Sequence, residues 1–420
     1  MQKRFLREPL FTKDFDRDNR NMRLIFFLLF PFFLLAEVIP GVERFFDEYA
    51  IRYKGKKIGL ITNHTGVDRQ LQTTLSRFFE SDLLLAVLFS PEHGIHGQWH
   101  AAQNVPNDLW ENVPVYSLHG ETRRPTPQML QNLEVIVYDI QCTGVRAYTY
   151  PTTLFYMMEE AAKLGIEVVV LDRPNPINGV VVDGPMLEDK WRSFIGYLNV
   201  PYCHGMTIGE LARFFNSEYK IGCHLTVVPM KGWKREMSFK DTELPWIPPS
   251  PNVPEPDTPL YCPSTGLLGE LHLGSIGIGY TLPFKIVGAP WIRAADLVEK
   301  LNSQKVPGVR FHPFHFRPFW GNYKGIDCQG VLIKIVDPLV YRPLTVQYLI
   351  LGLLKSMYPK EFMERIDLSP QAKDLFAKAN GTEEIYRMLV EEKYPAWKLI
   401  EVHKKEREQF LEKRKKYLLY

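Results

Sequence analysis

Three carboxylate side chains follow short apolar runs of the sequence, and they are the first candidates for chemistry. These residues are Glu92, Asp139 and Asp172. If the apolar runs are parallel strands, their carboxyl ends meet at one rim of a sheet, where open α/β folds bind their ligands. Two carboxyl groups can hydrolyse a glycosidic bond, because one protonates the leaving oxygen while the other activates water or attacks as nucleophile. The three residues therefore indicate acid–base chemistry at this rim, with Glu92 as the leading candidate for the acid.

Each carboxylate also has a purely structural interpretation. Asp172 can cap the turn that follows it, and Asp139 can be a buried carboxylate that pairs with Arg146. Glu92 lies in a Ser-Pro-Glu-His-Gly turn, where an exposed glutamate costs nothing. Glu121 can equally belong to a surface loop. The sequence alone leaves both interpretations open for all four residues.

Three histidines follow the turn at spacings of three and four residues. On a helix, His93, His96 and His100 would share one face, as in some zinc sites. However, Gly94 and Gly97 interrupt this segment and disfavour a stable helix. We therefore expect no metal here, and expect His93 to tune the pKa of the adjacent glutamate or to bind a sugar hydroxyl.

The elements that must position these groups alternate between strands and helices. Strands are predicted at 57–63, 83–89, 135–140, 167–172 and 225–229, and helices at 71–79, 154–164 and 208–215. Continuous apolar strands separated by helices predict a parallel sheet covered on both faces, which is an α/β, Rossmann-like fold. The turn after the first strand lacks a GxGxxG fingerprint, so no nicotinamide or other cofactor is expected.

A proline-rich stretch at 244–256 divides the chain and marks a domain boundary or the rigid wall of a cleft. We predict a Rossmann-like catalytic domain at 40–245 and a smaller α+β auxiliary domain at 250–420. In the second domain, strands are predicted at 309–316 and 330–336, and helices at 344–357, 371–379, 384–391 and 398–416.

The N-terminal residues 1–36 are predicted to be an extension and a signal peptide. Residues 24–36 form an apolar run that follows Arg23 and ends in alanine, as in a secretory signal. The run is shorter than the roughly 20 residues of a membrane span. We expect an exported protein, periplasmic or extracellular in a bacterium, without a stable membrane span after signal cleavage. An uncleaved anchor or a buried helix is the alternative.

Composition narrows the classes of partner. The 420 residues are 45% hydrophobic and 24% charged, with a formal net charge of +3, which is typical of a globular protein. The one basic run, 404–416, is interrupted by three glutamates and predicts a solvated helix face, so no nucleic-acid partner is expected. The five cysteines include no CxxC pair, which argues against a zinc ribbon or a thioredoxin-like site.

Several motifs, taken in order, resemble one known family. They are Gly59-Leu-Ile-Thr-Asn-His-Thr-Gly66, Ser90-Pro-Glu-His-Gly94, Tyr116-Ser-Leu-His-Gly-Glu-Thr-Arg-Arg-Pro-Thr126, Leu171-Asp-Arg-Pro-Asn-Pro-Ile-Asn-Gly179, His204-Gly-Met-Thr-Ile-Gly-Glu-Leu-Ala212, Pro249-Ser-Pro-Asn252 and Arg414-Lys-Lys-Tyr-Leu-Leu-Tyr420. From about residue 40 to its end, the chain resembles the exo-β-N-acetylmuramidases, a family formerly known as a domain of unknown function. The resemblance implies a Rossmann-like catalytic domain, an auxiliary domain and a cleft between them.

The resemblance also implies an activity and a site. The family releases N-acetylmuramic acid from the non-reducing ends of peptidoglycan fragments, so the expected partner is a peptidoglycan-derived oligosaccharide or muropeptide. Glu92 corresponds to the glutamate of the family's Pro-Glu-His-Gly motif. The predicted catalytic residues are Glu92, His93 and Asp139, and the predicted substrate-binding residues are Glu121, Arg124, Arg146, Tyr148, Asp172, His204 and Asn252.

The sequence departs from the family pattern at three places. Cys142 stands where the family usually has Asp, and Cys203 replaces an Arg. The segment 275–280 reads Ser-Ile-Gly-Ile-Gly-Tyr, where the family commonly shows Ser-Glu-Gly-Arg-Gly-Thr. An Arg fork suits the lactyl carboxylate of muramic acid, so its loss predicts an altered substrate or weaker activity.

Three hypotheses follow. The first is a glycoside hydrolase acting on muramic-acid-terminated glycans. The second is a peptidoglycan- or sugar-binding protein that has lost catalysis, and the third is a metal-dependent hydrolase that uses the three histidines.

Overall fold

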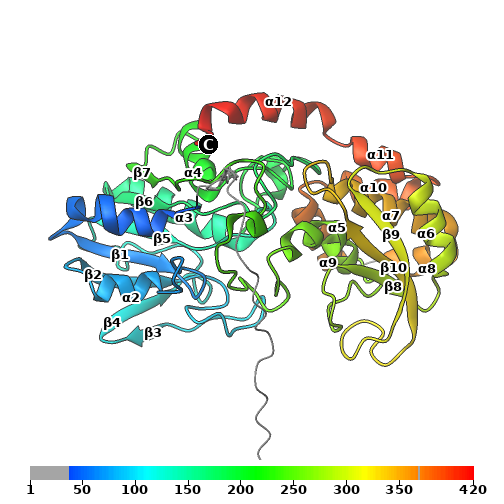
Figure 1. Ribbon diagram of the computed structural model, residues 1–420, viewed down its shortest axis with the longest axis horizontal. Coiled ribbons are helices and arrows are strands. Elements are labelled where there is room, and N and C mark those ends of the chain that lie inside the picture. The colour runs from blue at the N-terminus through cyan, green and yellow to red at the C-terminus, as the bar shows by residue number, and fades with distance from the viewer. Residues whose placement is uncertain (1–36, 368) are drawn as a thin grey trace, which may run out of the picture. The chain divides into compact units, whose positions relative to one another are not determined.

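This computed structural model describes residues 37–367 and 369–420 of the chain. A seven-stranded sheet organises the first half of the described residues (Figure 1). The strands are β1 (Lys57–Thr62), β2 (Leu84–Ser90), β3 (Asp108–Trp110), β4 (Val113–Ser117), β5 (Val135–Asp139), β6 (Glu167–Leu171) and β7 (Leu225–Val228). Their order is β3-β4-β2-β1-β5-β6-β7, and only β3 pairs antiparallel with its neighbour. The predicted signal segment lies outside the described residues.

Side chains that point alternately to opposite faces of the strands explain why helices cover this sheet on both sides. On β5, Ile136 and Tyr138 pack into one apolar cluster, whereas Val135 and Val137 pack into another. The first cluster includes α3 (Thr149–Leu164) and α4 (Ile208–Glu218), and the second includes α1 (Gly41–Arg44) and α2 (Thr74–Phe79). Successive side chains of a strand point to opposite faces, so a wholly apolar strand needs helices on both sides. The predicted α/β fold class is confirmed.

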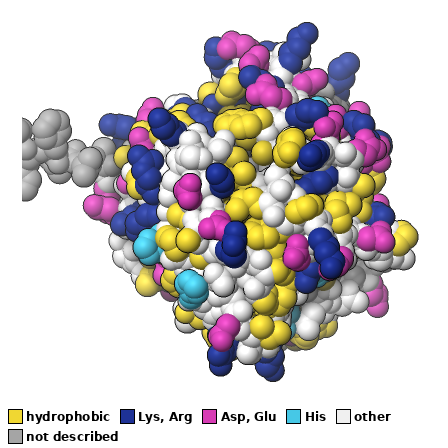
Figure 2. All heavy atoms as spheres, turned by 90° about the vertical axis from the view of Figure 1, so that its right-hand side faces the viewer, with side chains coloured by type: hydrophobic (Ala, Val, Ile, Leu, Met, Phe, Trp, Pro, Cys, Tyr) yellow, Lys and Arg dark blue, Asp and Glu magenta, His cyan; other side chains and the backbone are white. Residues whose placement is uncertain are grey.

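A smaller antiparallel sheet lies in the second half of the chain. It has the order β8-β10-β9, with β8 (Ile286–Ala289), β9 (Val309–Phe316) and β10 (Cys328–Ile335). The helices of this half are α5 (Thr258–Glu270), α6 (Ala294–Ser303), α7 (Pro343–Met357), α8 (Pro359–Ile366), α9 (Pro370–Asn380) and α10 (Glu384–Glu391). Figure 2 shows the face of this half, where basic, acidic and apolar side chains are interspersed.

The C-terminal segment differs from the single helix predicted at 398–416, and that prediction is wrong. Two helices, α11 (Ala396–Glu401) and α12 (Lys404–Arg414), are separated by His403, which has a positive φ of 56°. This left-handed conformation interrupts the helix and redirects the chain. Figure 1 shows α12 leading from the second half back to the first.

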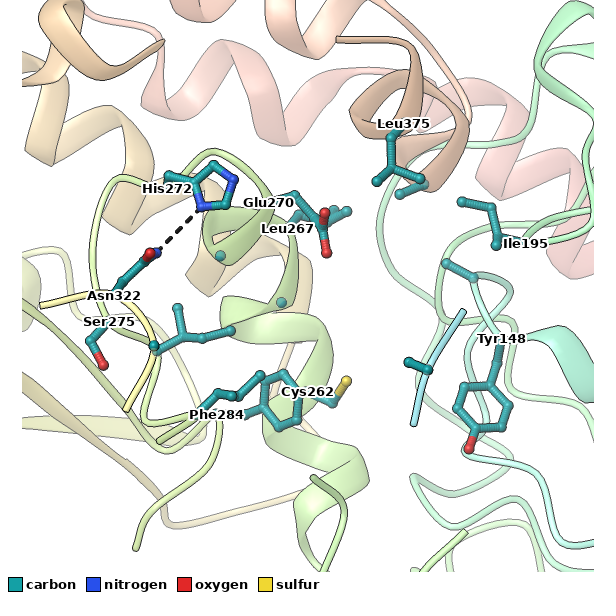
Figure 3. A pocket seen from close by; sticks show the side chains of 18 of the residues that line it. Tyr148, Ile195, Cys262, Leu267, Glu270, His272, Ser275, Phe284, Asn322 and Leu375 are labelled. Atoms are coloured by element: carbon teal, nitrogen blue, oxygen red, sulfur yellow. Dashed lines mark hydrogen bonds between the residues drawn. The ribbon is translucent and has the colours of Figure 1, made fainter. Parts of the chain in front are cut away.

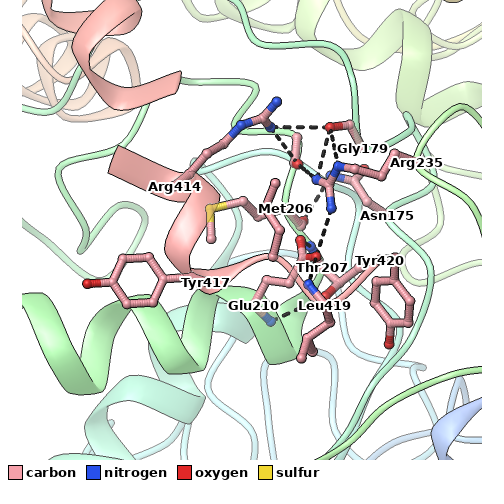
Figure 4. Close-up of polar contacts among 12 residues, drawn as sticks. Asn175, Gly179, Met206, Thr207, Glu210, Arg235, Arg414, Tyr417, Leu419 and Tyr420 are labelled. Carbon is pink, nitrogen blue, oxygen red and sulfur yellow. Dashed lines mark hydrogen bonds and ion pairs between the residues drawn. The ribbon is translucent and has the colours of Figure 1, made fainter. Parts of the chain in front are cut away.

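The last residues bind to the first sheet and its helix α4 (Figure 4). Arg414 donates hydrogen bonds to the carbonyl oxygens of His204 and Gly205, at 3.0 and 2.7 Å. The Leu419 amide donates to Glu210 at 2.9 Å, and the Tyr420 hydroxyl donates to Asp172 at 2.7 Å. Charged and polar groups of the terminus thereby satisfy buried groups of the sheet domain.

Within the described residues, no helix combines the length and the apolar character needed to cross a bilayer.

Candidate active site

The turn after β2 places Glu92 at the carboxyl edge of the sheet. The amide of Gly94 donates to the carbonyl of Pro91 at 3.0 Å and closes the turn. His93 and Gly94 both adopt positive φ values, 71° and 76°. A non-glycine residue in this conformation is strained, and such strain is common at functional sites. The same conformation excludes a helix here, so the three histidines do not share a helical face.

Two donors fix the carboxylate of Glu92. Its Oε1 accepts from the backbone amide of Ala102 at 2.8 Å, and its Oε2 accepts from the hydroxyl of Thr149 at 2.7 Å. Thr149 is the first residue of α3, so Glu92 lies at a helix N-terminus, where the helix dipole favours negative charge. Nε2 of His119 lies 3.7 Å from Oε1.

These contacts set the charge of Glu92. Burial would raise the pKa of the carboxyl, but the hydrogen bonds from Ala102 and Thr149 and the nearby His119 and His93 lower the pKa below its ordinary value. With 13% of its side chain exposed, Glu92 remains accessible while it is held in one orientation. It therefore stands ready as an ionised carboxylate.

Two buried histidines, His93 and His119, support the turn that carries Glu92. Nδ1 of His119 lies 3.0 Å from the carbonyl oxygen of Gln103, which leaves Nε2 facing Glu92. Burial lowers the pKa of His119. Nδ1 of His93 lies 2.6 Å from the carbonyl oxygen of Trp99. Both rings are buried, so they orient the turn and its carboxylate and do not line the open cleft.

Glu92 opens into a cleft of about 510 Å³, a size that suits a small ligand. One side is formed by residues of the first half of the chain, which are Glu92, Ala101, Ala147, Tyr148, Thr149, Ile195 and Tyr202. The other side is formed by α5, the 272–284 segment, the β9–β10 loop and α9. Figure 3 shows Tyr148 and Ile195 across the cleft from the α5 side chains. The hydroxyl of Tyr148 is buried and has no hydrogen-bond partner within the described residues.

The second half contributes both a carboxylate and an apolar wall. Glu270, the last residue of α5, lines the cleft beside His272 and Ser275. The two isoleucines that distinguish segment 275–280 from the family pattern, Ile276 and Ile278, also line it. The change from charged to apolar residues therefore falls in the cleft itself.

Asp139, predicted to be catalytic, is fully buried outside the lining of the cleft. Its partner is Arg173, with Nε 2.5 Å from Oδ1 and Nη2 2.7 Å from Oδ2, and Thr74 also donates to it. The pairing with Arg146 considered from the sequence is wrong. Asp139, at the end of β5, thereby connects this strand to the loop after β6 and to α2, which is a structural role.

Asp172 likewise turns toward the protein interior. It accepts from the hydroxyls of Thr207 and Tyr420, both at 2.7 Å, and from the amide of Gly209 at 2.8 Å. Burial, followed by the charge of Glu210, raises the pKa of Asp172 to about 7. The residue caps α4 and anchors the C-terminus.

The remaining predicted binding residues lie outside the cleft lining. Arg146 donates to four backbone carbonyls, those of Pro185, Val200, Ala379 and Asn380, and burial lowers its pKa to about 10. It thereby ties the segment after β5 to the end of α9. Burial likewise lowers the pKa of His204, to about 3.

Three further predicted residues sit at or near the surface. Arg124 stacks on Tyr156 at 3.8 Å and pairs with Glu159, while Glu121 is exposed and Asn252 is partly exposed. Of the ten predicted residues, only Glu92 and Tyr148 line the cleft.

The described residues contain no group of three His, Cys, Asp or Glu side chains placed to share a metal ion. His93 faces Tyr150, and His96 stacks on Trp110 with ring centroids 4.9 Å apart. All five cysteines, which lie in the described part of the chain, are free thiols.

Several groups of the site carry no signal in the sequence that would identify them. Thr149 and His119 lay within recognised segments but carried no signal of their own. Glu270, His272 and Asn322 come from the second half, and only the folded chain brings them to the cleft. Glu270 ends a helix that the sequence analysis did not predict.

The fold and the cleft define a Rossmann-like α/β protein with a carboxylate-lined pocket of sugar size. Residues 58–257 match the N-terminal domain of the exo-β-N-acetylmuramidase NamZ family, and residues 260–420 match its C-terminal domain. The chain belongs to this family, as its motifs predicted.

One relative and two solved structures extend the comparison. The peptidoglycan β-N-acetylmuramidase NamZ of Bacillus subtilis (strain 168) is 41% identical over 387 residues, which cover 91% of this chain and 92% of the relative. A DUF1343 family protein from Bacteroides fragilis NCTC 9343 is 38% identical with a TM-score of 0.86, covering 91% of this chain and 99% of its own. A second such protein from the same strain is 28% identical with a TM-score of 0.71, covering 92% and 99%.

Proposed function

We propose that this chain is an exported, exo-acting β-N-acetylmuramidase that releases N-acetylmuramic acid from the non-reducing ends of peptidoglycan fragments. The observation that carries the proposal is the placement of Glu92. This carboxylate is hydrogen-bonded, ionised and open to the cleft, at the strand end where α/β folds bind their ligands. The named activity of the Bacillus subtilis relative supports the choice of sugar.

The rest of the cleft suits an amino sugar. Ser275 and Asn322 offer polar groups that can bind sugar hydroxyls or the acetamido group. Ile195 and Leu375 offer apolar contact for the methyl groups of the acetamido and lactyl substituents. Ligand sites commonly combine a mainly apolar lining with a few placed polar groups.

The test uses muropeptides that end in N-acetylmuramic acid. Wild-type protein is expected to release the free sugar, detected by mass spectrometry, whereas Glu92→Gln is expected to release none while it unfolds at the same temperature. Full release by Glu92→Gln would remove Glu92 from the reaction.

Export is part of the proposal, because peptidoglycan lies outside the cytoplasmic membrane. The apolar run at 24–36 supports it. N-terminal sequencing of the mature protein is expected to begin after this run, and a mature chain that retains it would contradict signal cleavage.

A binding protein that has lost catalysis is the second candidate, and the apolar Ile276 and Ile278 in the cleft favour it. Calorimetry that detects muropeptide binding, combined with no product after long incubation, would support this candidate against the enzyme.

A further inference from the structure

We propose that Glu270 is the second carboxyl of the reaction and donates the proton to the leaving oxygen, while Glu92 acts as the ionised partner. This inference rests on the proposed glycosidase function. It assigns a role to a residue that the sequence motifs did not indicate, and it gives Glu92 the opposite protonation state from that of a general acid.

The geometry places the two carboxyl groups on different walls of one cleft. Glu92 accepts from Thr149, which adjoins Tyr148, so it belongs to the wall of the first half. Glu270 belongs to α5, on the wall of the second half. Figure 3 shows the carboxylate of Glu270 directed from the end of α5 toward the space that separates it from Tyr148 and Ile195. A sugar held between the walls has one carboxyl on each side.

The surroundings of the two groups favour opposite charges. Glu92 has a backbone amide and a hydroxyl as donors and lies at the N-terminus of α3, which all stabilise the anion. Glu270 lies at the C-terminal end of α5, where the helix dipole disfavours a negative charge. Its side chain is open to the cleft, yet the surrounding protein displaces enough water to raise the pKa of the carboxyl, which His272 offsets only in part.

Two carboxyl groups whose environments separate their pKa values can divide the roles of acid and base. Protonated Glu270 gives its proton to the glycosidic oxygen as the bond from the anomeric carbon to that oxygen breaks, and the leaving sugar departs as an alcohol. Water adds its oxygen to the anomeric carbon, and the proton it loses passes to the carboxylate of Glu92. Glu92 then releases a proton to solvent and Glu270 takes one up, which restores both groups.

The experiment compares two substrates in the full-length protein. One is a disaccharide with N-acetylmuramic acid at its non-reducing end, whose sugar leaving group needs a proton. The other is 4-nitrophenyl β-N-acetylmuraminide, whose acidic phenol needs little help. Glu270→Gln is expected to lower kcat on the disaccharide by about 10²–10⁴-fold, the usual contribution of general acid catalysis, and to lower it far less on the nitrophenyl substrate. Glu92→Gln is expected to lose activity on both.

Glu299→Gln is the matched control, because Glu299 is exposed on α6 and lies outside the cleft lining. It is expected to equal wild type on both substrates. An equal loss on both substrates in Glu270→Gln, or full activity on the disaccharide, would overturn the assignment. If wild-type protein forms product from neither substrate, the proposed function is overturned instead. Failure of the Glu270 assignment and failure of the proposed function therefore give different results.

Discussion

Removal of the Thr149 hydroxyl tests how the site sets the charge of Glu92. Thr149→Val preserves the branched shape of the side chain but deletes the donor that lies 2.7 Å from Oε2 of Glu92. A hydrogen bond to a charged group contributes about 1.5–3 kcal/mol. Since one pKa unit corresponds to about 1.4 kcal/mol, the pKa of Glu92 is expected to rise by about 1–2 units.

The assay is the pH dependence of kcat/KM on the nitrophenyl muraminide. In wild type, the acid limb reports protonation of Glu92, whose pKa lies below its ordinary value. Loss of the donor disfavours the anion, so the acid limb is expected to move to higher pH by about 1–2 units. Activity well above that limb is expected to change little.

Thr153→Val is the control, because its hydroxyl donates to the backbone of α3 at Thr149 and does not contact Glu92. Its acid limb is expected to match wild type. A folded Thr149→Val protein with an unmoved acid limb would refute the reasoning that Glu92 works as the ionised group.

Three other changes probe the surrounding structure. Arg146→Met removes the guanidinium donor from four carbonyls, of which, within the described residues, only that of Pro185 keeps a second donor, the Tyr202 amide, and the change is expected to lower the free energy of unfolding by about 3 kcal/mol or more, measured with urea; a loss below about 1 kcal/mol would contradict this. The pKa of Asp172 is raised to about 7 in the folded chain, so as pH rises this carboxyl loses its proton at a lower pH in the unfolded chain than in the folded one. The free energy of unfolding is therefore expected to fall as pH rises from about 4 to 7. Asp172→Asn should remove this part of the decline, and parallel stability curves would argue against it. Ile278→Arg restores a cation in the cleft and is expected to lower KM for a muraminide with a free lactyl carboxylate but not for its amide, whereas equal changes would contradict a carboxylate contact.

The strands of the large sheet could be predicted because their apolar runs are continuous. The short β3 and β4 were missed, since residues 108–117 are largely exposed or half-buried and include Pro114. The helix α5 was missed because prolines and glycines interrupt it, including Pro263 within it. The break at His403 has no glycine or proline to announce it, so the sequence predicted one helix in place of two.

The candidate site was predictable only on one wall. Glu92 could be found because it follows a strand end, and local pattern locates such ends. Asp139 and Asp172 also follow strand ends, yet Arg173 and the start of α4 bind them inside the protein. Those partners are brought together by tertiary contacts, which local sequence patterns do not predict. The same holds for Glu270, which lines the cleft from the second half of the chain.

The central claim is that the cleft releases N-acetylmuramic acid, and the most direct measurement compares two chromogenic glycosides. Purified protein without its N-terminal extension is incubated with 4-nitrophenyl β-N-acetylmuraminide and, in parallel, with 4-nitrophenyl β-N-acetylglucosaminide. Rapid release of nitrophenol from the muraminide alone, lost in Glu92→Gln, is the predicted result. Release from the glucosaminide at an equal or higher rate, or no release from either glycoside, would contradict it.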